Sequence, residues 1–180
     1  GTGIIVTSGL DKNEEIPTLK APESIEEKLN RLGKEITIPS ARENIHDIAG
    51  IRVVCNFIDD VYTVADMLLG QNDIHLIEKK DYIKNPKDSG YRSLHLVISV
   101  PVFLLDGCEE VPVEIQLRTV AMDFWASLEH QLRYKNEKYH APIVDLELKA
   151  CAEINSTLDV RMQELFDELN KQELSFNEKE

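Results

Sequence analysis

The sequence predicts an α+β fold in which a mixed sheet of about five strands is flanked by helices, with a long helix at the C-terminal end. Apolar and polar residues alternate over 51–57, 93–100 and 111–118, which is the period of strands. Apolar residues recur at helical spacing over 121–132 and 143–172. The strands and helices occur in runs rather than in regular alternation, so the pattern favours helices packed on an antiparallel or mixed sheet.

The first part of the chain has the weakest pattern. Residues 1–19 suit no regular element, and we expect them to be weakly ordered. A helix is expected to begin at Pro22, since proline suits a first turn, and to stop at Gly33. A short polar helix is expected over 40–46 and a strand over 50–57.

The middle of the chain predicts one helix and three strands. Asp59 is a suitable cap for a helix that ends at Gly70. A strand over about 73–79 leads into a lysine-rich loop. Two further strands over 93–103 and 111–118 are separated by Asp106-Gly107, a hairpin signal.

Two helices are expected to follow the last strand. Thr119 is the predicted cap of the first, whose apolar stripe we expect in the core: Ala121, Trp125, Leu128 and Leu132. The second has its own stripe: Leu146, Ala150, Ile154, Leu158, Leu165 and Leu169. An amphipathic helix of this length either wraps the sheet or packs against another subunit, and the sequence leaves both open.

Composition narrows the class of protein. The 180 residues carry a formal net charge of −13, which disfavours non-specific binding to duplex nucleic acid. A local basic cluster can still hold a nucleotide: Lys79, Lys80, Lys84, Lys87 and Arg92. Cys55 and Cys151 fall on apolar faces, so we expect buried thiols in a reducing cytoplasm. No apolar run is long enough to span a membrane.

Several polar residues are predicted to share one face of the sheet, because alternate strand residues point the same way. They are Arg52, His95, Glu114, Gln116 and Arg118. A solvated sheet face has a similar pattern. The loop over 81–91 favours a site, since it brings lysines, a glycine and Tyr91 next to this face.

The residue types on this face suit phosphate chemistry. Asp47 precedes a strand and Glu114 lies within one, so the two carboxylates can share Mg²⁺, which favours one or two protein carboxylates with phosphate oxygens. Lysines and Arg52 would neutralise phosphate charge. Tyr91 either stacks on a purine or covers the core edge. His95 either donates to phosphate or is a hydrogen-bonded surface histidine.

Two other classes receive less support. The pair His46-Asp47 is similar to that of metal-dependent phosphohydrolases, but it runs straight into a strand and no second histidine ligand spacing follows. The chain also contains no Walker-type or dinucleotide-binding glycine motif.

Four segments together resemble the synthetase domain of RelA/SpoT-type proteins. These are His46-Asp47-Ile48-Ala49-Gly50-Ile51-Arg52, Lys80-Asp81-Tyr82-Ile83 with Pro86-Lys87, Gly90-Tyr91-Arg92-Ser93-Leu94-His95, and Val113-Glu114-Ile115-Gln116-Leu117-Arg118-Thr119 with the following 121–130. The resemblance covers 20–135 as a catalytic domain, and leaves 136–180 as a helical extension that could serve oligomerisation. The length is similar to that of small alarmone synthetases, stand-alone GTP pyrophosphokinases with a nucleotidyltransferase-like fold.

The resemblance implies transfer of the β,γ-pyrophosphate of ATP to the ribose 3′-OH of GTP or GDP, giving pppGpp or ppGpp and AMP in the stringent response. Asp47 and Glu114 would be catalytic and hold Mg²⁺, and Glu114 could instead assist deprotonation of the 3′-OH. The residues implied on the ATP side are Lys20, Lys28, Arg31 and Arg52. Those implied around GTP or GDP are Lys80, Lys87, Tyr91, His95 and Gln116, with Tyr91 stacked on guanine. Homotetramers are implied as well.

The chain departs from the family pattern at Thr18, where an ATP-contacting arginine is expected, and in the short stretch over 135–145. The Thr18 departure favours a second hypothesis, a nucleotide-binding regulatory module with weak or no turnover. The presence of both Asp47 and Glu114 favours an enzyme.

Overall fold

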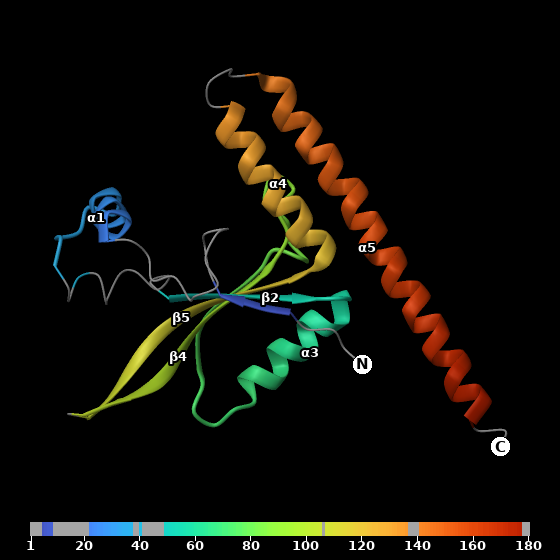
Figure 1. Ribbon diagram of the computed structural model, residues 1–180, viewed down its shortest axis with the longest axis horizontal. Helices are drawn as coiled ribbons and strands as arrows, with labels where there is room; N and C mark the ends of the chain where they lie inside the picture. Colours follow the sequence, from blue (N-terminus) through green and yellow to red (C-terminus); the bar gives the residue numbers. More distant parts are fainter. Residues whose placement is uncertain are drawn as a thin grey trace.

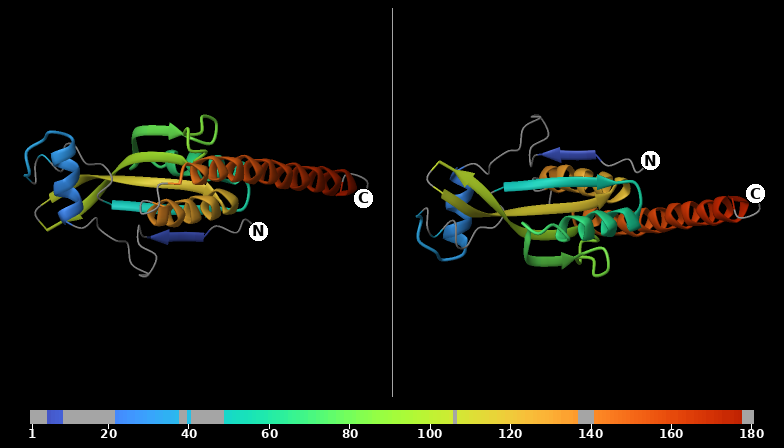
Figure 2. Two further views of the ribbon diagram at one scale, coloured as in Figure 1. Left: turned by 90° about the horizontal axis from the view of Figure 1, so that it is seen from above. Right: turned by 90° about the horizontal axis from the view of Figure 1, so that it is seen from below.

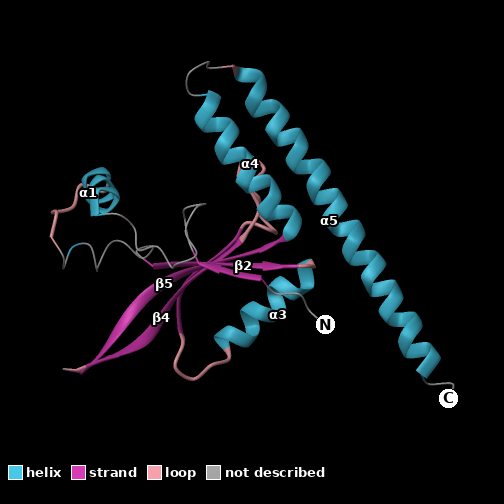
Figure 3. Cartoon of the chain, viewed as in Figure 1, coloured by secondary structure: helices cyan, strands magenta, loops and turns pink. Residues whose placement is uncertain are grey.

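The computed structural model describes residues 5–8, 22–37, 40, 49–105, 107–136 and 141–177. Within these residues the chain forms a mixed sheet flanked by helices, which confirms the predicted α+β class (Figures 1 and 3). The elements are β1 (Ile5–Ser8), α1 (Pro22–Arg31), β2 (Ala49–Cys55), α3 (Ile58–Leu69), β3 (His75–Asp81), β4 (Leu94–Leu104), β5 (Gly107–Thr119), α4 (Val120–Asn136) and α5 (Pro142–Asn177).

The sheet has five strands in the order β1-β2-β5-β4-β3. Strand β2 runs parallel to β5, and all other neighbours are antiparallel. The predicted hairpin is confirmed, since β4 pairs with β5 as far as Leu104 and Gly107. The parallel pair in the middle places the start of β2 beside the middle of β5, which brings distant parts of the sequence to one site.

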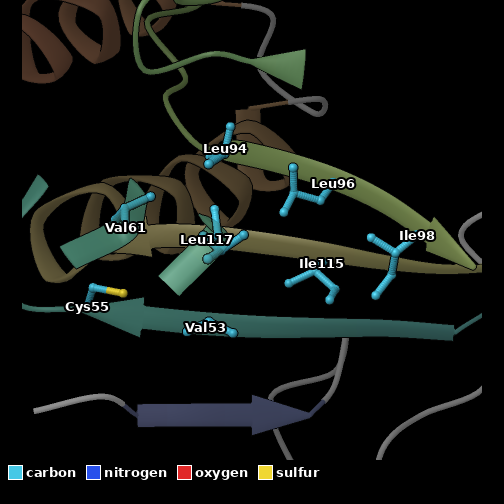
Figure 4. Close-up of a cluster of buried hydrophobic side chains, with 9 residues drawn as sticks. Val53, Cys55, Val61, Leu94, Leu96, Ile98, Ile115 and Leu117 are labelled. Atoms are coloured by element: carbon cyan, nitrogen blue, oxygen red, sulfur yellow. The ribbon is translucent and has the colours of Figure 1, made fainter. Parts of the chain in front are cut away.

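One face of the sheet is the hydrophobic core (Figure 4). Alternate residues of β2, β4 and β5 point to this face, as period two requires. Val61 and Ala65 of α3 pack against them and are fully buried. The buried strand residues are Val53, Cys55, Leu94, Leu96, Ile98, Ile115 and Leu117. Full burial of one such side chain contributes about 1.5–3 kcal/mol, so this face fixes the register of the sheet.

The helices lie on opposite sides of the sheet. Figure 1 shows α3 on one side, with α4 and α1 on the other, and Figure 2 shows α5 running beside α4 and continuing beyond it. The face opposite the core, which carries the predicted polar residues, is therefore the face toward α4.

Two predictions at the start of elements are wrong. Residues 1–19 were expected to hold no element, yet β1 lies within them, because four residues can form an edge strand when β2 supplies the hydrogen-bond partners. Asp59 is not the cap of α3. Phe57 occupies that position without a side-chain bond, and Asp59 lies in the first turn, where its backbone N–H donates to Gln163 Oε1 of α5 at 3.0 Å. Of the predicted helix over 40–46, all but Ser40 lies outside the described residues.

The cap predicted at the other junction is confirmed. Thr119 Oγ1 accepts a hydrogen bond from the backbone N–H of Met122 at 3.1 Å, in the first turn of α4. The same hydroxyl donates to Asp159 Oδ2 of α5 at 2.6 Å, and both side chains are buried. Asn155 Nδ2 of α5 donates to the Ala121 carbonyl at 2.6 Å. These bonds fix α5 against the start of α4.

The long helix docks through a face other than its apolar stripe, so of the two alternatives that the sequence left open, the stripe does not wrap the sheet of its own chain. The docking face contains Leu148, Ala152 and Asp159, which are buried. The predicted stripe is exposed, with Leu146, Ala150, Ile154, Leu158, Leu165 and Leu169 all on the surface of the chain. The stripe of α4 is only partly core: Trp125 is buried, but Leu128 and Leu132 are exposed. Small and polar residues allow α5 to approach closely, and so the inner face is not the most apolar one.

The thiols differ from prediction at one position. Cys55 is buried, whereas Cys151 is exposed, because its neighbour Ala152 occupies the docking face of the helix. Within the described residues, no helix is both long and apolar enough to cross a membrane.

Candidate active site

Four of the predicted site residues form a single row across the polar face of the sheet. Arg52 of β2 pairs with Gln116 of β5, Gln116 pairs with His95 of β4, and His95 pairs with Lys80 of β3. Partners at one register point to the same face, so the row follows directly from strand order. Glu114 lies one step along β5 on this face, opposite Val97.

A chain of hydrogen bonds connects this row to the loop before β4. Arg118 Nη2 donates to the hydroxyl of Tyr91 at 2.6 Å, and that hydroxyl lies 2.8 Å from His95 Nε2. His95 Nδ1 lies 3.0 Å from Glu114 Oε1. A carboxylate only accepts, so His95 Nδ1–H is the donor to Glu114, while the donor between the Tyr91 hydroxyl and Nε2 is set by the tautomer of the ring. These contacts connect Arg118, through Tyr91 and His95, to the Glu114 carboxylate.

The loop holds Tyr91 among aromatic rings and cations. Tyr82 and His95 meet the Tyr91 ring edge-on, with centroid distances of 6.1 and 5.8 Å. Lys87 Nζ lies 5.0 Å from the Tyr91 ring centroid and the Arg118 guanidinium 5.2 Å from it. Both distances suit cation–π contacts, so this ring already presents its π system to positively charged groups.

An open pocket of about 220 Å³ lies beside the hydrogen-bonded side chains of His95 and Glu114. It is lined by Glu78, Lys80, Tyr82, Lys87, His95, Val97 and Glu114. Lys80 Nζ donates to Glu78 Oε2 at 2.9 Å, and this hydrogen bond raises the pKa of Lys80. The pocket thus combines two ammonium groups with two carboxylates, a set that can hold a phosphorylated ligand and also accept a proton.

A second group of charges lies between the sheet and α4. Asp123 Oδ1 is 3.2 Å from Arg118 Nη1 and 3.5 Å from Arg52 Nη1. Burial and, less strongly, the neighbouring Arg118 lower the pKa of Arg52. Arg118 is 5% exposed, and it also donates to Gln116 Oε1 at 2.9 Å. Two close guanidinium groups that share one carboxylate leave a net positive field, which favours phosphate.

The described residues fit Mg²⁺ only in part. Among them, no group of three or more His, Cys, Asp or Glu side chains could hold a metal ion. Mg²⁺ needs only one or two carboxylates when phosphates complete its shell, and Glu114 lines the pocket. Asp47 lies outside the described residues. In the chain it precedes Gly50 by three residues, and Gly50 pairs with Glu114.

The other predicted residues are placed less completely. Lys20 and Thr18 lie outside the described residues. Lys28 and Arg31 occupy the last turn of α1, on the α4 side of the sheet in Figure 1, and the pocket lining does not include them.

Three residues of the hydrogen-bond network and the pocket were given no role from the sequence. Arg118 was expected on the polar face but was given no role, although it is the hub of the network. Asp123 and Glu78 were not singled out. Asp123 stands at the fourth position of α4, so its place opposite a strand arginine depends on how that helix docks. Glu78 follows a register irregularity in β3, and simple alternation does not place such a residue.

Fold and site together define an α+β protein with a lysine-lined pocket beside a hydrogen-bonded carboxylate, a site that suits phosphorylated ligands. A family model described as the region found in RelA / SpoT proteins matches residues 18–139. The match covers more than half of the chain, and the chain therefore belongs to the RelA/SpoT family.

Two relatives within this family are GTP pyrophosphokinases of Bacillus subtilis. The chain is 51% identical to GTP pyrophosphokinase YwaC of Bacillus subtilis over 145 residues, which are 80% of this chain and 69% of that protein. It is 42% identical to GTP pyrophosphokinase YjbM of the same organism over 137 residues, 76% of this chain and 65% of that protein. The chain thus spans about two thirds of each relative.

A solved structure shares the fold. The crystal structure of the small alarmone synthetase 1 from Bacillus subtilis, bound to its product pppGpp, matches 92% of this chain and 79% of its own, with a TM-score of 0.79 and 37% identity.

Proposed function

We propose that this chain is a GTP pyrophosphokinase that transfers the β,γ-pyrophosphate of ATP to the ribose 3′-OH of GTP or GDP. The products are pppGpp or ppGpp and AMP, as in the stringent response. The observation that carries the proposal is Glu114, hydrogen-bonded through His95 to Tyr91 at the edge of a lysine-lined pocket. The names of the relatives, GTP pyrophosphokinases and an alarmone synthetase, support the same reaction.

The acceptor nucleotide would occupy the pocket. Tyr91 would stack on guanine, a role that suits a ring held between cationic groups. Lys80 and Lys87 line the pocket and would bind the 5′ phosphates, while His95 and Gln116 would fix the nucleotide from the sheet. Lys87 changes its contact from the Tyr91 ring to a phosphate in this proposal.

Glu114 is the proposed base. Its carboxylate would take the proton of the 3′-OH as that oxygen attacks the β-phosphorus of ATP, while the bond between the α- and β-phosphates breaks and AMP leaves. With Glu114 as the base, Asp47 would hold Mg²⁺, which when bound would neutralise charge on the transferred phosphates. The hydrogen bond from His95 would orient the Glu114 carboxylate at the edge of the pocket.

The donor ATP would lie toward the positive field of Arg52 and Arg118. Arg52 would meet its phosphates, and the basic residues of the N-terminal region would complete the site: Lys20, Lys28 and Arg31.

The test is an incubation of the purified chain with Mg²⁺, ATP and either GTP or GDP, followed by ion-exchange separation of the nucleotides. AMP formed in equal amount with a more highly phosphorylated guanosine nucleotide would support the proposal, and the faster acceptor would identify the preference. ADP without a new guanosine species would refute it.

The exposed stripe of α5 supports a proposal on assembly. We propose that this stripe packs against another copy of the chain, giving a homo-oligomer, and a homotetramer as the family resemblance implies. Leu146, Ile154, Leu165 and Leu169 are 61–70% exposed, a row of large apolar side chains that water disfavours. Because the proposed substrates are cytoplasmic nucleotides, we also propose that the protein acts in the cytoplasm.

A further inference from the structure

The loop that carries Tyr91 is in close contact with α5. Gly90 has a φ of +91°, a left-handed conformation that side chains disfavour. A Cβ atom added to Gly90 would lie 2.5 Å from the Cβ of Ala152, closer than two non-bonded carbon atoms approach each other. Ala152 is 3% exposed. The helix and the loop therefore fit only because one residue has no side chain and the other has a single methyl group.

The same turn of α5 also contacts the residue after Tyr91. Arg92 Nη1 donates to the Ala152 carbonyl at 3.3 Å. Ala152 thus contacts the residue on each side of Tyr91, by packing against Gly90 and by accepting from Arg92. Tyr91 itself packs against the cluster formed by Trp125, Leu148 and Ala152.

Independent bonds fix the position of this turn along the helix. Trp125 Nε1 donates to the Leu148 carbonyl at 2.9 Å, one turn before Ala152. Thr119 donates to Asp159 two turns after it. With both ends held by α4 and its cap, the Ala152 turn cannot slide, and the position of the helix is transmitted to the loop.

We propose that Ala152 is a positioning residue, which sets the backbone around Tyr91 and thereby the affinity for the guanosine acceptor. The inference rests on the proposed function, in which Tyr91 stacks on guanine. It adds that a residue of α5, far from the pocket lining in sequence, acts on acceptor binding through Gly90 and Arg92 without touching the nucleotide.

The first test compares Ala152→Val with Ala150→Val. Both changes add the same branched side chain to the same helix, but Ala150 is exposed and lies in the stripe proposed for assembly, so the two variants are compared at the same oligomeric state, checked by gel filtration. Overpacking against Gly90 should raise the KM for GTP or GDP about tenfold in Ala152→Val, while the KM for ATP and kcat change less than about twofold. Ala150→Val should match the wild type. Equal KM values in the two variants, or an equal rise for ATP and the guanosine nucleotide, would overturn the proposal.

A second test reverses the steric conflict. Gly90→Ala should raise the KM for the acceptor, because its new methyl group meets Ala152. Adding Ala152→Gly should restore part of this loss, although the strain of a positive φ remains. The proposal predicts that the double variant binds the acceptor more tightly than Gly90→Ala alone. If Ala152→Gly gives no relief, the contact does not control the loop. This pair decides the question even if Ala152→Val fails to fold.

Fluorescence distinguishes the stacking role of Tyr91 from the positioning role of Ala152. Trp125 is the only tryptophan of the chain and lies in the cluster with Tyr91 and Ala152. Titration with GDP should change its emission in the wild type, with a midpoint shifted about tenfold in Ala152→Val and unshifted in Ala150→Val. Unchanged acceptor affinity in Tyr91→Ala would refute the stacking role. A normal Tyr91→Ala defect together with an unshifted Ala152→Val midpoint would refute the positioning role alone.

Discussion

His95 donates through Nδ1 to Glu114, at a distance of 3.0 Å across two neighbouring strands. The two residues are not direct register partners, since His95 pairs with Gln116. The contact is therefore diagonal, and it reaches along β5 to turn the carboxylate toward the pocket. The other ring nitrogen faces Tyr91, so one imidazole links the proposed base to the proposed guanine-binding ring.

Glu114→Gln should abolish turnover and keep nucleotide binding. The amide has the same shape but cannot take a proton, and loss of a general base lowers rates by about 10²–10⁴-fold. Turnover is measured as AMP release, and binding by equilibrium dialysis with GDP. Glu109→Gln, at the exposed end of the same strand, is the matched control and should behave as wild type. Unchanged turnover in Glu114→Gln would remove this carboxylate from the mechanism.

The ring and the hydroxyl of Tyr91 can be tested separately. Tyr91→Ala should raise the KM for GTP or GDP by the equivalent of about 1–3 kcal/mol of lost stacking, with little effect on ATP. Tyr91→Phe keeps the ring and should retain most of this affinity, while it loses the bonds to His95 and Arg118. Steady-state kinetics with each substrate varied in turn would show the difference. A defect confined to ATP would contradict the assignment.

Arg118→Lys should destabilise the fold, because a single ammonium nitrogen cannot take the places of both Nη1, which bonds to Asp123, and Nη2, which bonds to Tyr91 and Gln116. A buried acceptor left unsatisfied costs about 1–3 kcal/mol, and for these part-buried acceptors we expect the low end of that range in the free energy of unfolding. Urea denaturation provides the measurement. Arg133→Lys is the control, since the Arg133 side chain is 41% exposed and surface pairs of this kind, here with Glu129 and Asp145, contribute about 0–1 kcal/mol. Equal losses in both variants would mean that Arg118 is not a structural hub.

Asp159 makes stability depend on pH. Burial raises its pKa above the ordinary 3.8, while the Thr119 bond and Arg92 oppose this shift. The folded chain thus holds the proton more tightly than the unfolded chain. Its contribution is most favourable below pH 3.8, and it is lost as the pH rises through the folded pKa.

Asp159→Asn removes this titration and can still accept the Thr119 bond. The free energy of unfolding of the variant should increase relative to that of the wild type as the pH rises above 3.8. Urea unfolding at a series of pH values gives the difference curve, with the exposed Asp73→Asn as control. A flat difference for Asp159→Asn would show that its carboxyl group has the same pKa in both states.

The exposed stripe of α5 predicts an effect of charge on assembly. Leu165→Glu places a carboxylate in the stripe and should shift the protein toward smaller species in light scattering after gel filtration. Val160→Glu makes a similar change at an exposed position on another face of the same helix and should leave assembly intact. Dissociation by both variants, or by neither, would exclude the stripe as the interface.

The sequence predicted the central sheet well, for a physical reason. Period-two alternation in β2, β4 and β5 specifies both faces at once, so a core face with Leu96 and Ile115 implies a polar face with His95 and Glu114. Strand pairing aligns the polar faces of neighbouring strands. The parallel pairing of β2 with β5 places Arg52 beside Gln116.

The rest depends on packing between distant segments. The face by which α5 docks is chosen by close approach at Ala152 and by the buried Asp159, and neither is prominent in an apolar pattern. The role of Asp123 requires the docked position of α4. Strand β1 forms because β2 offers an open edge, and the sequence of a four-residue segment does not show that such an edge is present.

The central claim, transfer of an intact pyrophosphoryl group, is tested most directly with ATP labelled at the β-phosphate. The purified chain would be incubated with this ATP, Mg²⁺ and GDP, and the products separated. We predict that the label moves to the guanosine product while AMP remains unlabelled. Label retained in ADP, with or without a phosphorylated guanosine product, would contradict the account.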